Sequence, residues 1–346
     1  MTFERPDLSQ VDPEILAYIE SLESELTRLR EGSRSRSKST EPMELAEPNE
    51  PPTSACLVTM SKNGLIKRTY RHLYARQRRG GMGIFDLDTP EEDPPTFLTL
   101  ADDNADLLLI TDFGRGYRLP LSSLPAAQIR ERGQNIGDLV SMQPGETVRV
   151  MLPAQDEGYA AILSERGYVR LLRYNYVGTN MRPGTPIFDV GRFGAVAAGC
   201  WSSGEAELLI ATKQGKGIRF REKMVHANGS LGIRLDRGDD VVAIAGIDEE
   251  SSVLLIGADG KGSIRMMSGF AANKAPGSGG KLLLKTDQLV GAATIKDSDD
   301  VFAISGLSKI IRFQAVEIPP KEGVVQGVNC MALRADEVTA ITVAAL

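Results

Sequence analysis

The residues best suited to chemistry in this sequence lie in the segment 77–83, QRRGGMG. Gln77, Arg78 and Arg79 can donate hydrogen bonds to phosphate oxygens, and the glycines that follow let the backbone approach a partner closely. The window from residue 55 to residue 85 contains seven Lys and Arg residues and no Asp or Glu. An unopposed basic segment of this kind is typical of a surface that binds a polyanion.

Residue types required for catalysis are scarce near this segment. Tyr70 and Tyr74 stand in basic surroundings, but no activating base accompanies them, and a covalent nucleophile needs one. Asp86 and Asp88 form an acidic pair without the glutamates that would complete a metal site. Three cysteines and two histidines are too dispersed for a zinc site. We therefore expect no enzyme activity, no catalytic residue, no metal and no cofactor.

Composition predicts a protein with a large core and no membrane segment. Hydrophobic residues make up 42% of the 346 residues, and no apolar run reaches the length of about 18 residues that spans a bilayer. The amino terminus is charged and has no apolar leader, so no secretory signal is expected. The three cysteines lie far apart in apolar contexts, which favours buried free thiols in the cytoplasm.

The net charge of −6 does not describe the main body of the chain. Residues 1–54 contain six basic and twelve acidic residues, and subtracting these from the totals of 40 and 46 leaves 34 of each for residues 55–346. The larger part is therefore neutral, with its positive charge concentrated in its first thirty residues. Such a body can still bind a polyanion on one face.

The first 54 residues are predicted to form a helix and a linker. Asp12 and Pro13 suit the start of a helix and Gly32 its end, so residues 1–32 are expected to contain one amphipathic helix. Its apolar residues follow a heptad pattern: Ile15, Ile19, Leu22, Leu26 and Leu29. Residues 13–31 can dock on a protein surface or form a homodimer as a short coiled coil. Residues 33–54 are polar, charged and rich in Pro, and are predicted to be a disordered linker.

From residue 55 onward one pattern occurs six times: an apolar strand, a turn, and a strand with Arg or Lys. The copies begin LVTMSKNGLIKR (57–68) and end VFAISGLSKIIR (301–312). Five turns contain a glycine, and the mean spacing is 49 residues: Gly64, Gly114, Gly167, Gly215 and Gly260. In the sixth copy Leu307 falls at this place, so a different turn is expected there. A second group of glycines and further apolar segments follow each hairpin.

This repeat predicts an all-β domain over residues 55–346. Strand, turn, strand, loop and two further strands describe one four-stranded blade per unit, and six blades in a ring protect the sheet edges that a single blade would expose. A solenoid is the alternative, but neither terminal unit has a distinct polar cap. The expected fold is a six-bladed β-pinwheel, similar to a propeller.

The domain resembles the C-terminal DNA-wrapping domain of DNA gyrase A. QRRGGMG closely matches that family's gyrase A box, QRRGGKG, and lies at the matching place in the first blade. Met82 stands where the box has lysine, which removes one positive donor. The resemblance implies that double-stranded DNA bends around a positive rim without sequence readout. Gyrase carries its nucleophilic tyrosine in a separate breakage–reunion domain, so a stand-alone, non-catalytic protein is expected here.

The predicted DNA-binding residues are the box, its basic neighbours and the cations that follow each turn. Cations two residues apart on a strand project from the same face and could form a track along the rim. The full set is Lys67, Arg68, Arg71, Arg76, Gln77, Arg78, Arg79, Gly80, Gly81, Gly83, Arg118, Arg170, Arg173, Arg219, Arg221, Lys223 and Arg265.

Two functions remain open at this point. The first is a nucleoid-associated protein that binds and bends or wraps DNA, alone or with gyrase or another topoisomerase subunit. The second is a protein-interaction scaffold that keeps the fold with little DNA affinity, favoured by the neutral body and Met82. Rim cations that are mostly paired with Asp or Glu would favour the scaffold.

Overall fold

The computed structural model describes residues 50–345, which lie in one compact unit, Pro48–Leu346. The predicted helix and most of the predicted linker lie outside these residues. Every unit of the repeat begins with a β-hairpin. Its first strands are β1 (Ala55–Ser61), β5 (Asp106–Thr111), β9 (Tyr159–Ser164), β13 (Glu207–Thr212), β17 (Ser252–Gly257) and β21 (Asp300–Ser305). Its second strands are β2 (Leu65–Tyr70), β6 (Arg115–Pro120), β10 (Tyr168–Arg173), β14 (Lys216–Arg221), β18 (Lys261–Met266) and β22 (Lys309–Gln314).

Each hairpin is followed by one turn of 3₁₀ helix and two further strands. The 3₁₀ helices are η1 (Arg71–Leu73), η2 (Leu121–Ser123), η3 (Tyr174–Tyr176), η4 (Glu222–Met224), η5 (Met267–Gly269) and η6 (Ala315–Glu317). Two-residue outer strands come next: β3 (Ile84–Phe85), β7 (Gln134–Asn135), β11 (Thr185–Pro186), β15 (Ser230–Leu231), β19 (Lys281–Leu282) and β23 (Val328–Asn329). Two short helices, α2 (Ile136–Leu139) and α3 (Val190–Phe193), follow β7 and β11. The inner strands are β4 (Pro95–Asp102), β8 (Val148–Pro153), β12 (Val196–Ser202), β16 (Val241–Ile247), β20 (Leu289–Ile295) and β24 (Val338–Ala344).

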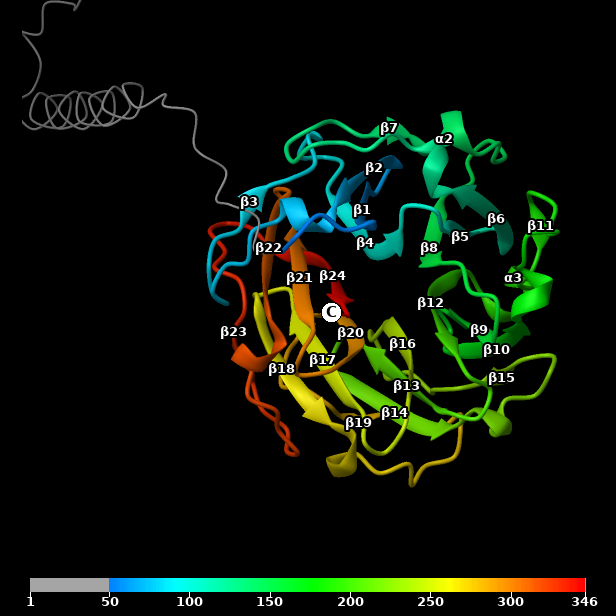
Figure 1. Cartoon of the computed structure of the whole chain (residues 1–346). Helices are drawn as coiled ribbons and strands as arrows, with labels where there is room; N and C mark the ends of the chain where they lie inside the picture. The colour runs from blue at the N-terminus through cyan, green and yellow to red at the C-terminus, as the bar shows by residue number, and fades with distance from the viewer. Residues whose placement is uncertain (1–49, 346) are drawn as a thin grey trace, which may run out of the picture. The chain divides into compact units, whose positions relative to one another are not determined.

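The strands form six antiparallel four-stranded sheets, so the predicted six-bladed all-β fold is confirmed. Figure 1 shows the sheets around a common centre, with β24 and β4 beside each other where the ring closes. We number the blades 1–6 by the order of their hairpins. None of the helices within residues 50–345 is long and apolar enough to cross a membrane.

The composition of a blade differs from the prediction of one repeat unit per blade. The order in blade 1 is β4-β1-β2-β7, so its outer strand comes from the second unit, and the same exchange recurs around the ring. The last exchange joins the ends of the ring, because β3 of the first unit pairs with β22 of blade 6 through Ile84 and Ile310. An outer strand of two residues would contribute little within its own unit. When it pairs with the preceding blade instead, it covers the exposed edge of that blade and links consecutive units.

The sixth hairpin turn uses the same geometry as the others, so the expectation of a different turn at Leu307 was wrong. The residue that corresponds to the turn glycines is Ser308, which has a φ of 60° where Gly114 and Gly215 both have 70°. Its hydroxyl accepts a 2.9 Å hydrogen bond from the Leu87 amide and donates a 2.7 Å bond to the Leu87 carbonyl. These two bonds offset the steric cost of a left-handed conformation for a residue with a side chain.

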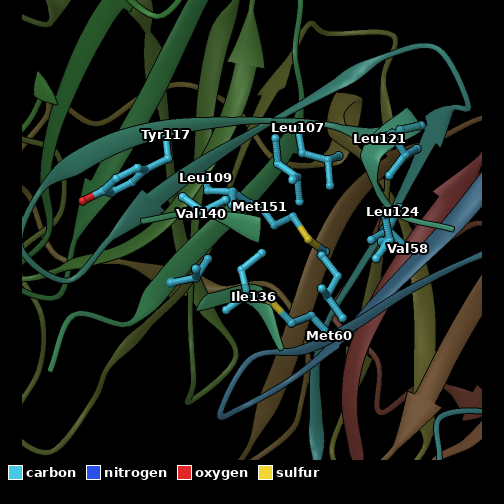
Figure 2. Close-up of a cluster of buried hydrophobic side chains, with 14 of the residues drawn as sticks. Val58, Met60, Leu107, Leu109, Tyr117, Leu121, Leu124, Ile136, Val140 and Met151 are labelled. Atoms are coloured by element: carbon cyan, nitrogen blue, oxygen red, sulfur yellow. The ribbon is translucent and has the colours of Figure 1, made fainter. Parts of the chain in front are cut away.

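The core consists of clusters between neighbouring blades. Because each blade is covered on both faces, its hairpin strands are continuous apolar runs, as in Leu107, Leu108, Leu109 and Ile110, all fully buried. Figure 2 shows one cluster, in which Val58 and Met60 of β1 meet Leu107 and Leu109 of β5. Burial of this kind at all six junctions fixes the hairpins, and with them the loops at the outer edge.

Candidate nucleic-acid interface

The box, residues 77–83, lies in the connection between η1 and β3 and crosses from blade 1 to blade 6. Its backbone is fixed at three points. The amide of Gln77 donates a 2.7 Å hydrogen bond to the carbonyl of Arg312, and that of Gly80 donates a 2.7 Å bond to the carbonyl of Cys330. The carbonyl of Gly81 accepts a 2.9 Å bond from the amide of Ala332. The box is thus part of the closure of the ring as well as a surface loop.

Two glycines of the box are required by this route. Gly80 and Gly83 have φ values of 77° and 72°, in the left-handed region that side chains disfavour. A Cβ on Gly83 would lie 2.6 Å from the carbonyl oxygen of Ile310, so β3 could not approach β22. Gly81 is also confined, because a Cβ there would lie 3.0 Å from Oε1 of Gln77. The glycines therefore serve the geometry of the loop.

The arginines of this loop fall into two kinds. Arg76 pairs with the buried carboxylate of Asp300 at 3.0 Å. Arg79 donates to the carbonyls of Glu317 and Asn329 at 2.7 and 3.0 Å, so both of these arginines hold the loop on the last repeat unit. Arg78 is exposed and makes no hydrogen bond or ion pair with its side chain within residues 50–345. Its guanidinium is available to an external anion.

Apolar side chains lie beside Arg78. Met82 is 49% exposed and Phe85, in β3, is 38% exposed. The box and the strand that follows it therefore expose one guanidinium without a partner in the described residues and two apolar groups.

Four of the predicted DNA-binding or related cations instead bridge neighbouring blades. Each occupies the fourth position of a second strand and donates to the carbonyl of the C-cap residue, which directly follows the next unit's 3₁₀ helix and ends it. We call these residues the junction arginines: Arg68 donates to Leu124, Arg118 to Val177, Arg219 to Phe270 and Arg312 to Tyr74. Three of them also pair with a carboxylate at the start of their own blade, namely Asp106, Glu207 and Asp300.

Lys67 and Arg265 are also buried. The ammonium of Lys67 lies 2.8 Å from Oδ1 of Asp86, which also accepts a 2.8 Å hydrogen bond from the Tyr74 hydroxyl. Asp86 therefore has a structural partner, and no cluster of three or more metal-ligating side chains occurs in the described part of the chain. Burial lowers the pKa of Arg265, whose guanidinium donates to the Gly269 carbonyl at 3.2 Å.

Arg71 lies where the two ends of the domain meet. It pairs with Glu50 at 3.0 Å and donates a 2.9 Å hydrogen bond to the carbonyl of Ala345. Glu50 also pairs with Arg312 at 3.0 Å. Burial raises the pKa of Glu50, but hydrogen bonds from Arg312 and Arg71 outweigh this effect and leave its pKa below the ordinary value.

The remaining predicted cations lie on blades 3 and 4. Arg170 donates a 3.0 Å hydrogen bond to the Ile187 carbonyl, and Lys223 pairs with Glu205 at 2.6 Å. Arg173 and Arg221 are exposed and have no side-chain ion pair or hydrogen bond within the described residues. Of the thirteen predicted cations, three are thus exposed and without a bonded partner among residues 50–345: Arg78, Arg173 and Arg221.

Comparisons with known proteins agree with this architecture. The family described as "DNA gyrase C-terminal domain, beta-propeller" matches residues 57–93, 105–139 and 206–248. The A subunit of DNA gyrase from Mycoplasma genitalium is 26% identical over 291 residues, which cover 81% of this chain and 35% of that protein. The corresponding protein of Staphylococcus aureus is 25% identical over 300 residues, covering 83% and 34%.

Two solved structures share the fold. A DNA gyrase A C-terminal domain gives a TM-score of 0.74 at 19% identity and covers 84% of this chain and 100% of that domain. The C-terminal domain of DNA topoisomerase IV gives 0.59 at 21% identity, covering 84% and 93%. The described unit is similar to the C-terminal domain of DNA gyrase A in sequence and in fold. The chain spans about a third of the length of the curated relatives it matches.

The described domain also exposes cations that the sequence analysis missed. Arg130 and Arg132 lie in the second unit's counterpart of the box, and Arg182 lies in the third unit's. Arg130 has a φ of 70° and stands where the box has Gly80. The signal was present, because each of these loops ends in a glycine directly before an outer strand. When the two loops are aligned on Gly83 and Gly133, Arg132 corresponds to Met82 and Arg130 corresponds to Gly80.

Proposed function

We propose that this domain binds double-stranded DNA along its outer edge, without sequence preference, and bends or wraps it. The observation that carries the proposal is the different bonding of the arginines in the box and directly before it. Arg76 and Arg79 are bonded to the last repeat unit, while Arg78 lies exposed with no protein partner in the described residues. A guanidinium held on a rigid loop suits a phosphate, which it can contact with two parallel hydrogen bonds.

The DNA track would run from the box over the next loops of the edge. Arg78, Arg130, Arg132 and Arg182 are exposed in the first three of these loops. The sixth loop has the exposed pair Lys321 and Glu322, whose charges cancel. DNA would therefore contact the early blades best, and wrapping would be partial.

Phosphate contacts imply a strong dependence on salt. If about six phosphates are neutralised, the slope of log K against log salt is roughly −5. Sequence preference would follow the bendability of DNA, since no base-reading element is involved.

We further propose that the domain acts on DNA topology and has no catalytic role of its own. The relatives are DNA gyrase A proteins, so gyrase or another topoisomerase subunit is the expected partner, and the nucleoid is the expected location. The homodimer proposed through residues 13–31 would be a separate property of the chain.

A plasmid relaxation assay tests the proposal. The protein is added to plasmid, a nicking-closing topoisomerase relaxes it, and the linking number is read after deproteinisation. We expect a shift in linking number that Arg78→Ala reduces strongly. Arg149→Ala is the matched control, because Arg149 is an exposed arginine on the inner strand β8 and outside the proposed track.

The assay separates the possible outcomes. Binding at low salt without a shift would leave a DNA-binding domain that does not wrap. Equal loss in both variants would indicate a general charge effect and contradict the role of the box. No binding at any salt would refute DNA binding.

A protein-interaction scaffold is the second candidate. It is favoured because six of the thirteen predicted cations are paired with carboxylates: Lys67, Arg71, Arg76, Arg118, Arg219 and Lys223. Failure to bind DNA, together with retention of a topoisomerase subunit on the immobilised protein, would support it.

A further inference from the structure

The junction between blades 3 and 4 lacks the arginine that bridges four other junctions. The fourth residue of β10 is Leu171, where β14 has Arg219 and β22 has Arg312. The same position in β18 is Ile264. Two of the six junctions are therefore formed without a junction arginine.

These two junctions are filled differently. Ile264 packs in one cluster with Ile318, the residue that ends η6, and each is 1% exposed. Leu171 is only partly buried, and beside it lies a cavity of about 440 Å³. The cavity is also lined by Val225, which ends η4, and by Glu222. The apolar pair is fully buried at one junction. At the other, Leu171 and Val225 pack against a core cluster but are only partly buried, and a cavity remains beside them. We call this second one the hollow junction.

The acceptors that hold an arginine elsewhere are present at the hollow junction. Arg219 donates to the carbonyls of Met267 and Phe270, the first residue of η5 and the residue that ends it. The corresponding carbonyls at the hollow junction belong to Glu222 and Val225. The carbonyls that would accept hydrogen bonds from an arginine are therefore present at this junction, and only the arginine that would donate them is missing.

A carboxylate completes this set of acceptors. The side chain of Glu222 is 1% exposed; its Oε2 accepts a 3.2 Å hydrogen bond from the amide of Ala206, and its Oε1 has no partner within the described residues. An unpaired buried carboxylate oxygen is costly, and a guanidinium would satisfy it.

We infer that this junction is a socket for an arginine side chain of a partner polypeptide. We call the cavity bounded by Leu171, Glu222 and Val225 the blade 3–4 socket. Tyr176, which lines it, is 68% exposed, and Met224 of η4 is 46% exposed. Tyrosine and methionine are enriched in protein interfaces, so their exposure here favours a polypeptide over a free small molecule.

The charges around the socket define the partner further. Three cations line the cavity: Arg170 donates to the Ile187 carbonyl, Lys223 is paired with Glu205 at 2.6 Å, and Arg173 is exposed. A strongly basic segment would be repelled here. The guest is therefore one arginine flanked by acidic residues, so that the guanidinium enters the socket and the acidic side chains meet Arg173 and Lys223. This inference goes beyond DNA binding and does not depend on it.

The test uses the full chain and the peptide acetyl-Asp-Glu-Arg-Glu-Asp-amide, with titration calorimetry as the readout. A peptide with citrulline in place of arginine is the control, because citrulline has the same shape and no charge. We expect the citrulline peptide, and the Glu222→Gln variant with the arginine peptide, to bind at least about tenfold more weakly. Equal binding of the two peptides, or no binding of the arginine peptide, would overturn the inference.

A second variant supplies the missing arginine within the chain. Leu171→Arg is expected to raise the thermal unfolding midpoint and abolish peptide binding, because its own guanidinium would occupy the socket. DNA binding of this variant should be unchanged, since Leu171 lies outside the proposed track. A variant that fails to fold, or that folds and still binds the peptide, would show that the acceptors do not accommodate an arginine and would overturn the inference.

Discussion

Nε of Arg312 donates a 2.7 Å hydrogen bond to Oδ2 of Asp300, and both side chains are buried where blade 6 meets blade 1. The same carboxylate holds Arg76, the residue directly before the box. One aspartate thus links the last hairpin, the closure of the ring and the loop that carries Arg78. The stability of the ring and the position of the proposed DNA contact depend on a common interaction.

Asp300→Asn tests this dependence. Removal of one partner of a buried ion pair leaves an uncompensated charge, so we expect the free energy of unfolding to fall by about 3–5 kcal/mol in chemical denaturation. Lys223→Ala is the control, because it breaks an exposed pair, and exposed pairs contribute little. Equal effects of the two substitutions would contradict a special role for Asp300.

Glu50→Gln is expected to destabilise the domain in a pH-dependent way. The pKa of Glu50 is lowered in the folded state from its ordinary value of 4.5, so the stability that it contributes is present above pH 4.5 and is lost as the pH falls through the lowered pKa. The wild type should therefore be the more stable protein at pH 7, and the difference should shrink below pH 4.5. A difference that is constant with pH would show that the Glu50 charge is not involved.

Gly83→Ala should destabilise the closed ring. Alanine at a φ of 72° is strained by about 1–2 kcal/mol, and its Cβ would lie 2.6 Å from the Ile310 carbonyl oxygen. The thermal midpoint should fall clearly. Gly323→Ala is the matched control, since a Cβ there meets nothing within 4 Å. Similar midpoints for the two variants would refute the packing argument.

Ser308 offers a test of the sixth turn. Ser308→Ala loses both hydrogen bonds to Leu87 and keeps the strain of a positive φ, so a loss of about 1–3 kcal/mol is expected. Ser308→Gly loses the same bonds but relieves the strain, and should be the less destabilised of the two. The opposite order in urea denaturation would show that the positive φ is not strained, and unchanged stability of both variants would show that the hydroxyl does not stabilise the turn.

The buried thiols should be unreactive in the folded protein. Burial raises the pKa of Cys330 to about 12 and also raises that of Cys56, so almost no thiolate exists at pH 8. A thiol reagent should modify these residues only after unfolding. Because Cys200 is only partly buried, the labelled residue must be identified, and rapid labelling of Cys56 or Cys330 in the native protein at pH 8 would contradict the burial of these two thiols.

Much of the fold could be predicted from the sequence because the repeat encodes it locally. The apolar runs and the turn glycines identify the hairpins, and their number identifies six blades. The exchange of outer strands could not be predicted, because Ile84 and Phe85 carry no signal that distinguishes pairing with their own blade from pairing with β22. The misassigned sixth turn had a similar cause: the left-handed position was expected to hold glycine, and Ser308 adopts it by bonding to Leu87.

The candidate site, like the fold, could be predicted from the sequence only in part. The amino-acid sequence by itself determined the repeat, the box and the recurrence of a cation after each turn, since these depend on residue types and spacing. Only the tertiary structure decided which cations remain available, because burial and pairing depend on residues far away in the chain. Arg312 pairs with Asp300 and Glu50, and Arg79 donates to carbonyls of the last unit, so neither guanidinium is free to bind a phosphate. Arg78 is left exposed. Charge is a property of the sequence, whereas its exposure is a property of the closed ring.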